Sequence, residues 1–324
     1  MASGASDNRC MGKPMKPGFI VGMPGVTRLR GVVLVLTALA SWSVSAYGID
    51  ETPTGLAFLT IGGGARAVGL AETMVADDQD AFVTEYNPAA LVDITRFAVS
   101  FAHGTFYQDT RGEYAASAVP LRAWSIGVRM GYVGTSDLPL RTGPSDQPLG
   151  LYDASNVIFQ GAVARTVDDR LAVGLSTAYV AQHINLETAQ GFVLGVGLRY
   201  RLRHNITVGT AFVNVGPPIK FVDRKFRMPN LFRFGGRWMI GRASARAEFV
   251  TADNDNVKWH LGSEVAIDPR LSLRAGVRFG YDTQMFNAGF GVRTPDGRFG
   301  VDYAFAPYTD ELGATHRFGL TVRP

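Results

Sequence analysis

The side chains that could carry out catalysis are few and scattered along the chain. His260 and Ser263 stand three residues apart in a segment with strand periodicity, so they would point to opposite faces and cannot form a dyad within that strand. The only cysteine, Cys10, lies near the N-terminus. The histidines have no metal-ligand spacing, and we predict neither an enzyme nor a bound metal or cofactor. They are His103, His183, His204, His260 and His316.

A glycine run resembles a loop that binds phosphate. It consists of Gly62, Gly63 and Gly64, followed by Gly69. No Lys-Ser or Lys-Thr pair follows and no βαβ unit surrounds the run, so nucleotide binding is not expected. Glycines also occur where a segment must pass close to another backbone. We therefore predict that this run, which includes Arg66, packs closely on a wall of strands.

Two polar pairs in the same region have alternative explanations. Asp77 and Asp78 could bind a cation or nearby arginines, or they could cap a helix that follows over residues 79–86. Asn87 and Pro88 could form a hinge that opens a path, or a turn in which Asn caps the backbone and Pro fixes φ. The sequence leaves both alternatives open.

Arginines recur on one face of the apolar segments in the rest of the chain. In a barrel they would face the lumen, where they could attract anionic head groups or carboxylates. We favour the alternative that they pair with inward acids such as Glu248, Glu264 and Asp302, because charges that face a lumen need partners. These arginines are Arg129, Arg199, Arg201, Arg233, Arg237, Arg274, Arg278 and Arg293.

The elements that would position these side chains are strands of about ten residues with period-two alternation. From Leu271 to Tyr281, apolar residues alternate with serine, glycine and two arginines. About fourteen such segments follow Thr95, and an even number is typical of bacterial membrane barrels. They start near Arg96, Glu113, Trp124, Asn156, Leu171, Gly191, Ile206, Leu231, Ala243, Val257, Leu271, Met285, Arg298 and Arg317.

The connections between these segments alternate in length. Those after even-numbered segments are short, such as Asp168-Asp169-Arg170. Most of those after odd-numbered segments are longer, notably Val133 to Asp153, Gly216 to Asn230 and Ala306 to His316. Outer membrane barrels have short periplasmic turns and longer external loops. We therefore predict a closed antiparallel barrel of about fourteen strands over residues 95–324, with both termini in the periplasm.

The N-terminal residues 1–46 have the features of a leader that is removed. Arg28 and Arg30 precede an apolar run, which closes on Val44-Ser45-Ala46, as at a signal peptidase site. A retained signal anchor is the alternative. The leader holds five of the 32 basic residues and one of the 28 acidic residues, which leaves 27 of each. A mature chain without excess positive charge gives no support to nucleic-acid binding.

Residues 47–94 differ in character from the leader before them and from the strand segments after them. We predict that they form a periplasmic N-terminus and a hatch that plugs the barrel. Here the sequence resembles the PorV/PorQ-like branch of the FadL-type outer membrane proteins. The resemblance rests on AFLTIGGGARAVGLAET, on DD followed by YNPAAL, and on the closing YAFAPYTDELGATHRFGL. It implies a barrel of fourteen strands with an N-terminal hatch.

The resemblance also implies a function and partners. The PorV-like branch suggests a component or cargo shuttle of type IX-like protein secretion, with exported cargo proteins or a secretion complex as partners. The alternative is a FadL-type channel for passive transport of hydrophobic compounds, which would need a continuous apolar pocket between hatch and wall. Arg317, Gly319 and Val322 match the C-terminal signal for the barrel-assembly machinery, whereas Pro324 replaces its usual aromatic residue.

Overall fold

The computed structural model describes residues 53–77, 79–144, 147–252, 257–309 and 312–324. The expected leader, residues 1–46, and its cleavage site lie outside the described residues. Asp78 and the first residues of the expected hatch also lie outside them.

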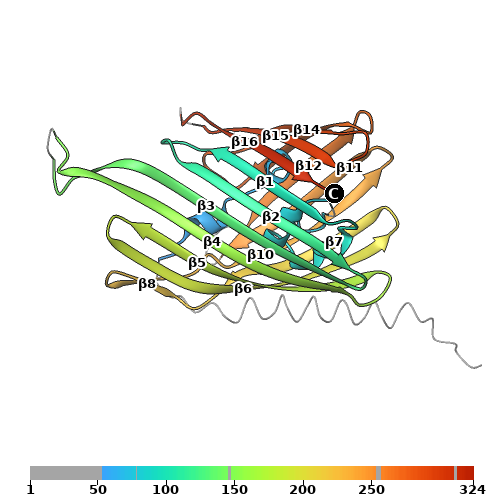
Figure 1. Cartoon of the computed structure of the whole chain (residues 1–324), viewed down its shortest axis with the longest axis horizontal. Coiled ribbons are helices and arrows are strands. Elements are labelled where there is room, and N and C mark those ends of the chain that lie inside the picture. The colour runs from blue at the N-terminus through green and yellow to red at the C-terminus, as the bar shows by residue number, and fades with distance from the viewer. Residues whose placement is uncertain (1–52, 78, 145–146, 253–256, 310–311) are drawn as a thin grey trace, which may run out of the picture. The chain divides into compact units, whose positions relative to one another are not determined.

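Fourteen antiparallel strands form a closed barrel, because the first strand, β1, is hydrogen-bonded to the last, β16 (Figure 1). The register of this closing pair places Phe101 opposite Leu320. The prediction of about fourteen strands is confirmed. The barrel strands are β1 (Ala98–Thr105), β2 (Arg111–Leu121), β3 (Trp124–Leu140), β4 (Gly150–Thr166), β5 (Leu171–Ile184), β6 (Glu187–Arg203), β7 (Ile206–Val215), β10 (Leu231–Ile240), β11 (Ala243–Ala252), β12 (Lys258–Ala266), β13 (Leu271–Phe279), β14 (Phe286–Arg293), β15 (Phe299–Pro307) and β16 (Ala314–Val322).

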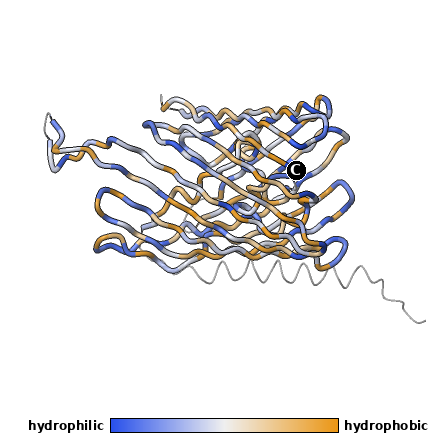
Figure 2. Tube along the Cα trace, in the orientation of Figure 1, coloured by the Kyte–Doolittle hydropathy of each residue, from blue (hydrophilic) through white to orange (hydrophobic). Residues whose placement is uncertain are grey.

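One face of the strands is buried and the other is exposed, as the alternation of their residues predicts. In β13, Leu273 and Phe279 point outward and are about half exposed, whereas Arg274 and Arg278 point inward and are buried. Figure 2 shows the same change between hydrophobic and hydrophilic residues along the other strands. In a closed ring, the backbone groups of every strand are hydrogen-bonded to a neighbouring strand. A barrel with an apolar outer face needs this closure, because no water reaches that face to satisfy a free strand edge.

The short turns share a local cap. Asp168 accepts hydrogen bonds from the amides of Arg170 and Leu171, and Asp268 does the same for Arg270 and Leu271. These side-chain hydrogen bonds stabilise each tight turn locally, without contacts from other parts of the chain.

The long connections differ from the expectation. Most of the predicted loop from Val133 to Asp153 is strand, because β3 and β4 continue to pair beyond the neighbouring β2. The connection after β7 contains a hairpin of β8 (Ile219–Phe221) and β9 (Arg224–Phe226). Cross-strand pairing thus orders segments whose composition is typical of loops.

The hatch lies inside the barrel and consists of short helices. They are η1 (Ala57–Thr60), α2 (Ala65–Gly69), η2 (Ala81–Glu85) and η3 (Pro88–Asp93). Thr54, near its start, forms a parallel bridge with Arg227 in the connection between β7 and β10. The described hatch therefore begins at the end of the barrel with the long connections, not at the short-turn end where a periplasmic N-terminus was expected. Backbone pairing with Arg227 fixes this position.

Within the described residues, no helix has both the length and the hydropathy to cross a membrane.

Candidate functional site: the hatch and its docking surface

Glycines of the barrel wall make room for the hatch. A Cβ atom added to Gly174 of β5 would collide with the backbone of Pro88 and Ala89, and one added to Gly197 of β6 would collide with the Asn87 side chain. On the opposite wall, an added Cβ on Gly289 would lie 3.2 Å from the Cα of Gly69. Several inward glycines, these three among them, are therefore contact positions for the hatch.

Asn87 joins two hatch segments to the wall. Its Nδ2 donates to the carbonyls of Val75, at 2.7 Å, and Leu198 in β6, at 3.0 Å. Its Oδ1 accepts from the amide of Ala89 at 3.0 Å, which caps η3, with Pro88 in the first turn. The side chain is fully buried. This geometry is that of a capped turn, in which both N–H groups of the side-chain amide are already used.

The hatch is expected to lose its fit on β6 when Gly197 is replaced by alanine. The new methyl group would occupy the position of the Asn87 side chain, and overpacking of this kind costs about 1–3 kcal/mol. We expect a lower thermal midpoint and faster cleavage of the hatch by an added protease. Gly161→Ala in β4 is the matched control, because no atom lies within 4 Å of its added Cβ. Equal cleavage rates in both variants would contradict the packing role of Gly197.

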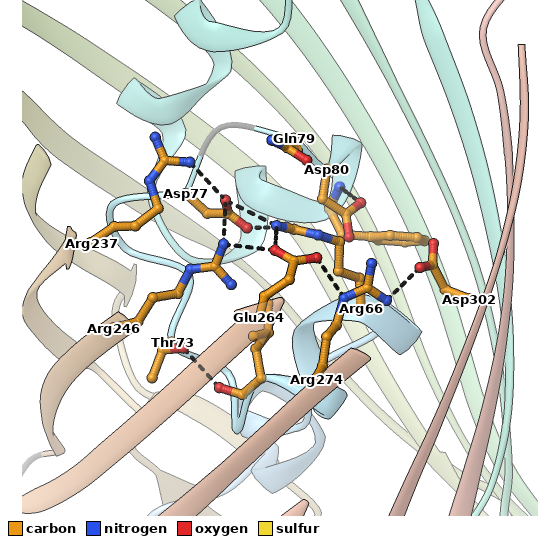
Figure 3. A network of polar contacts seen from close by, with 12 residues as sticks. Arg66, Thr73, Asp77, Gln79, Asp80, Arg237, Arg246, Glu264, Arg274 and Asp302 are labelled. Atoms are coloured by element: carbon orange, nitrogen blue, oxygen red, sulfur yellow. Dashed lines mark hydrogen bonds and ion pairs between the residues drawn. The ribbon is translucent and has the colours of Figure 1, made fainter. Parts of the chain in front are cut away.

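An ion-pair network joins the hatch to strands β10–β12 (Figure 3). Arg66 of α2 pairs with Asp77 of the hatch and with Glu264 of β12, the latter at 2.8 Å. Arg246 of β11 lies 3.5 Å from Asp77 and 3.1 Å from Glu264. Arg237 of β10 lies 3.6 Å from the same Asp77 carboxylate. Three guanidinium groups therefore surround Asp77, which is fully buried.

The network continues along the wall through Glu264. This carboxylate also accepts from Arg274 of β13 at 2.8 Å, and Arg274 reaches Asp302 of β15 at 2.5 Å. Charges buried this deeply are stable only when they are paired. The network thus fixes α2 and Asp77 at one place in the lumen.

Further ion pairs hold the rest of the hatch. Glu85 of η2 lies 2.9 Å from Arg129 in β3, and Asp93 of η3 pairs with Arg199 in β6. The predicted alternative, in which inward arginines pair with acids, describes these contacts. Arg201, two residues further along β6, lies 3.7 Å from the same Asp93 carboxylate, but its side chain is 47% exposed.

Burial and counter-charges act in opposite directions on the hatch acids. Burial by itself would raise the pKa of Asp77, but the guanidinium groups around it outweigh this effect and hold its pKa well below the ordinary range. Burial raises the pKa of Glu85, and the opposing charge of Arg129 only reduces this rise. Of these two acids, Asp77 is therefore the one whose ionised form the site stabilises.

The glycine run binds the hatch's own carboxylates. The amide of Gly62 donates to Glu72 at 3.2 Å, and that of Gly63 donates to Glu85 at 3.2 Å. An added Cβ on Gly64 would lie 3.0 Å from the ring of Phe82. Gly62 and Gly64 thus pack within the hatch, whereas Gly63 touches Tyr114 of β2 and Gly69 lies against Gly289 of β14, so the run packs partly on the strands, as expected.

The end of the hatch beneath the long connections is apolar. Leu56, Phe58 and Leu59, in and beside η1, pack in one buried cluster with Ile219 of β8 and Met228. This layer lies between the long-loop end and the ionic network along the hatch.

The hollows that border the hatch are polar. One of about 310 Å³ is lined by Gln79, Arg293 and Arg323, and one of about 410 Å³ is lined by Asp93 and residues of the 168–170 turn. An apolar hollow of about 730 Å³ lies on the outward face instead, over β1–β4 and β15–β16. Neither polar hollow is the apolar pocket between hatch and wall that the transport alternative requires.

The histidines differ in their surroundings. His260 is buried in the lumen, where its Nε2 lies 2.8 Å from the Tyr281 hydroxyl, and His103 pairs with Glu113 on the outward face. Within the described ranges, no three His, Cys, Asp or Glu residues are placed to hold a metal ion.

The barrel with its hatch is similar to solved channel structures. No known family profile matches the sequence, and no curated protein is similar to it. The toluene transporter TbuX from Ralstonia pickettii is 13% identical, with a TM-score of 0.61 over 81% of this chain and 98% of TbuX. The chain therefore shares the fold of these channels.

Two other solved structures give the same result. The toluene transporter TodX from Pseudomonas putida is 12% identical, with a TM-score of 0.60 over 81% of this chain and 97% of TodX. A FadL homologue from Pseudomonas aeruginosa is 12% identical, with a TM-score of 0.53 over 80% of this chain and 97% of that chain. These comparisons support the FadL-type part of the resemblance and do not identify the PorV/PorQ branch.

Some residues of the hatch site were not among the sequence candidates. Glu72 and Asp93 lie in the hatch and pair with Arg278 and Arg199. Arg246 lies on β11 among alanines, in the alternation Ala243-Ser-Ala-Arg-Ala-Glu248. This alternation was the available signal, because it places Arg246 on the same inward face as Glu248.

Proposed function

We propose that the protein is an outer membrane channel for the passive passage of hydrophobic compounds, and that its hatch must move for a compound to pass. The observation that carries the proposal is the match of barrel and hatch to nearly the full length of toluene transporters. This match supports the transport alternative better than the secretion hypothesis.

The outward face supports a location in the outer membrane. Large apolar side chains on this face are about half exposed, among them Met130, Phe159, Phe192 and Leu194. An apolar outer band around a closed antiparallel barrel is the arrangement of transmembrane barrels. Export through a cleaved signal peptide, insertion by the barrel-assembly machinery and a periplasmic position of the short turns follow from this proposal.

The hatch determines when the channel is open. In the described state it packs directly on the wall glycines and is held by ion pairs, so passage requires it to be displaced. A compound arriving from the long-loop end would first meet the apolar cluster around Phe58 and Met228. Apolar side chains there favour a hydrophobic compound over a hydrated ion.

Uptake by whole cells tests the proposal, because an intact outer membrane slows the entry of hydrophobic compounds. A strain lacking the gene would be given radiolabelled toluene at low concentration, with and without the plasmid-borne full-length gene. We expect faster initial uptake with the gene. Equal initial rates, with the protein present in the outer membrane fraction, would overturn the proposal.

The secretion hypothesis remains a prediction. It expects partners at the connections of residues 133–153 and 216–230, and a changed set of secreted and surface-attached proteins when the gene is deleted. Mass spectrometry of the culture medium and the cell surface measures this. An unchanged set would exclude a role as a secretion component or cargo shuttle.

A further inference from the structure

One buried arginine of the lumen has no acidic partner among the described residues. Nine arginines of the described residues are buried, and eight of them have a carboxylate oxygen within 4 Å. The ninth is Arg317 in β16, which is 2% exposed. Its Nε and Nη1 have no hydrogen-bond partner among the described residues. Burial of a guanidinium without a counter-charge costs free energy. Because the barrel pairs the other eight buried arginines, the unpaired state of Arg317 needs an explanation.

Aromatic rings surround the Arg317 guanidinium. Its Cζ lies 4.1 Å from the ring centre of Phe106 and 5.3 Å from that of Tyr114. Cation–π contacts stabilise the charge by about 0.5–2 kcal/mol each and leave the N–H groups of the guanidinium edge free to donate.

Arg317 also lies towards the end of the barrel that carries the long connections. It is opposite Gly104 in β1 and Ala304 in β15, close to the ends of both strands at the long connections. The neighbours on these strands are small, and Ala304 and Ala306 pack with Val68 of the hatch. A ligand at Arg317 would therefore contact the hatch on its way inward.

We propose that Arg317 binds the carboxylate of a small aromatic acid, with benzoate as the simplest example. The proposal rests on the proposed channel function and specifies its substrate: the aromatic rings fit the apolar body and the unpaired N–H groups fit the acid. A guanidinium donates two parallel hydrogen bonds to one carboxylate. The bound acid supplies the counter-charge that Arg317 lacks.

Binding of benzoate to the purified full-length protein in detergent tests the proposal, measured by calorimetry. Arg317→Met is expected to weaken benzoate binding about 10- to 100-fold, the effect of losing charge-assisted hydrogen bonds. Its thermal midpoint without ligand should equal or exceed that of the wild type, because an unpaired buried charge is removed. Arg165→Met is the matched control: Arg165 stacks on Trp124 at 5.1 Å, but it is exposed. Unchanged benzoate affinity in Arg317→Met would overturn the proposal.

Two further measurements keep the result decisive. If Arg317→Met does not fold, Arg317→Lys replaces it, with weaker benzoate binding expected because an ammonium cannot form the parallel pair of bonds. Wild-type affinity in Arg317→Lys would overturn the proposal. Toluene uptake by cells with Arg317→Met should equal that of the wild type. Loss of benzoate binding with normal toluene uptake in Arg317→Met supports the acid site. If the wild type itself does not take up toluene, the channel proposal fails, whereas the benzoate measurement still tests the acid site.

Discussion

Replacing Asp77 with asparagine should release the hatch from the barrel wall. The substitution removes the negative charge that Arg66, Arg237 and Arg246 share, and leaves three guanidinium groups close together in a buried place. Breaking a buried ion pair by removing one partner costs about 3–5 kcal/mol. We expect a clearly lower thermal midpoint and rapid cleavage of the hatch by added protease, with the barrel strands still protected.

A surface ion pair provides the control for this substitution. Lys220 pairs with Asp223 at 3.4 Å in the β8–β9 hairpin, where the Asp223 side chain is 92% exposed. Exposed pairs contribute about 0–1 kcal/mol, so Asp223→Asn should leave both the thermal midpoint and hatch cleavage close to the wild type. If Asp77→Asn and Asp223→Asn behaved alike, the ionic network would not be what holds the hatch.

A disulfide between hatch and wall should stop transport. An added Cβ on Gly319 of β16 would lie 3.3 Å from the Cβ of Ala65 at the start of α2, close to the range of about 3.5–4.5 Å found in disulfides. The sequence has one cysteine, Cys10, in the leader that is expected to be removed, so an Ala65→Cys/Gly319→Cys pair would meet no competing thiol. We expect toluene uptake by the oxidised double variant to fall at least about tenfold, and a reductant to restore it.

A second disulfide separates hatch movement from stiffening of the barrel. Ser100 and Thr321 are opposite each other in β1 and β16, with their hydroxyl oxygens 3.0 Å apart. A Ser100→Cys/Thr321→Cys pair would join wall to wall, and its uptake should not depend on the reductant. Full uptake by the oxidised Ala65→Cys/Gly319→Cys variant would show that compounds pass without displacement of α2.

The barrel could be predicted from the sequence because strand alternation is a local property. Expected starts at Trp124, Leu171, Ile206, Leu231 and Leu271 coincide with the observed strands. A period of two also assigns each side chain to one face, so the inward position of Arg129, Arg274 and Arg278 follows from their immediate neighbours. The extension of β3 and β4 could not be predicted, because it depends on pairing between segments of polar, loop-like composition.

The hatch illustrates what the sequence leaves undetermined. Its glycines, acids and Asn87-Pro88 were recognised as unusual, but their partners were not. Arg66 and Glu264 are 198 residues apart in the chain, and Asn87 and Leu198 are 111 apart. Such contacts depend on the path that the hatch takes across the inside of a closed sheet.

The sequence by itself therefore determined the number of strands, the face on which each side chain lies and the presence of a separate N-terminal segment, since each of these depends on neighbours within a few residues. The tertiary structure alone decided which arginine meets which carboxylate, because closing the barrel brings distant strands around the hatch. It also decided that Arg317 has no carboxylate partner among the described residues, since β1, β2 and the connection between them place a glycine and two aromatic rings against it.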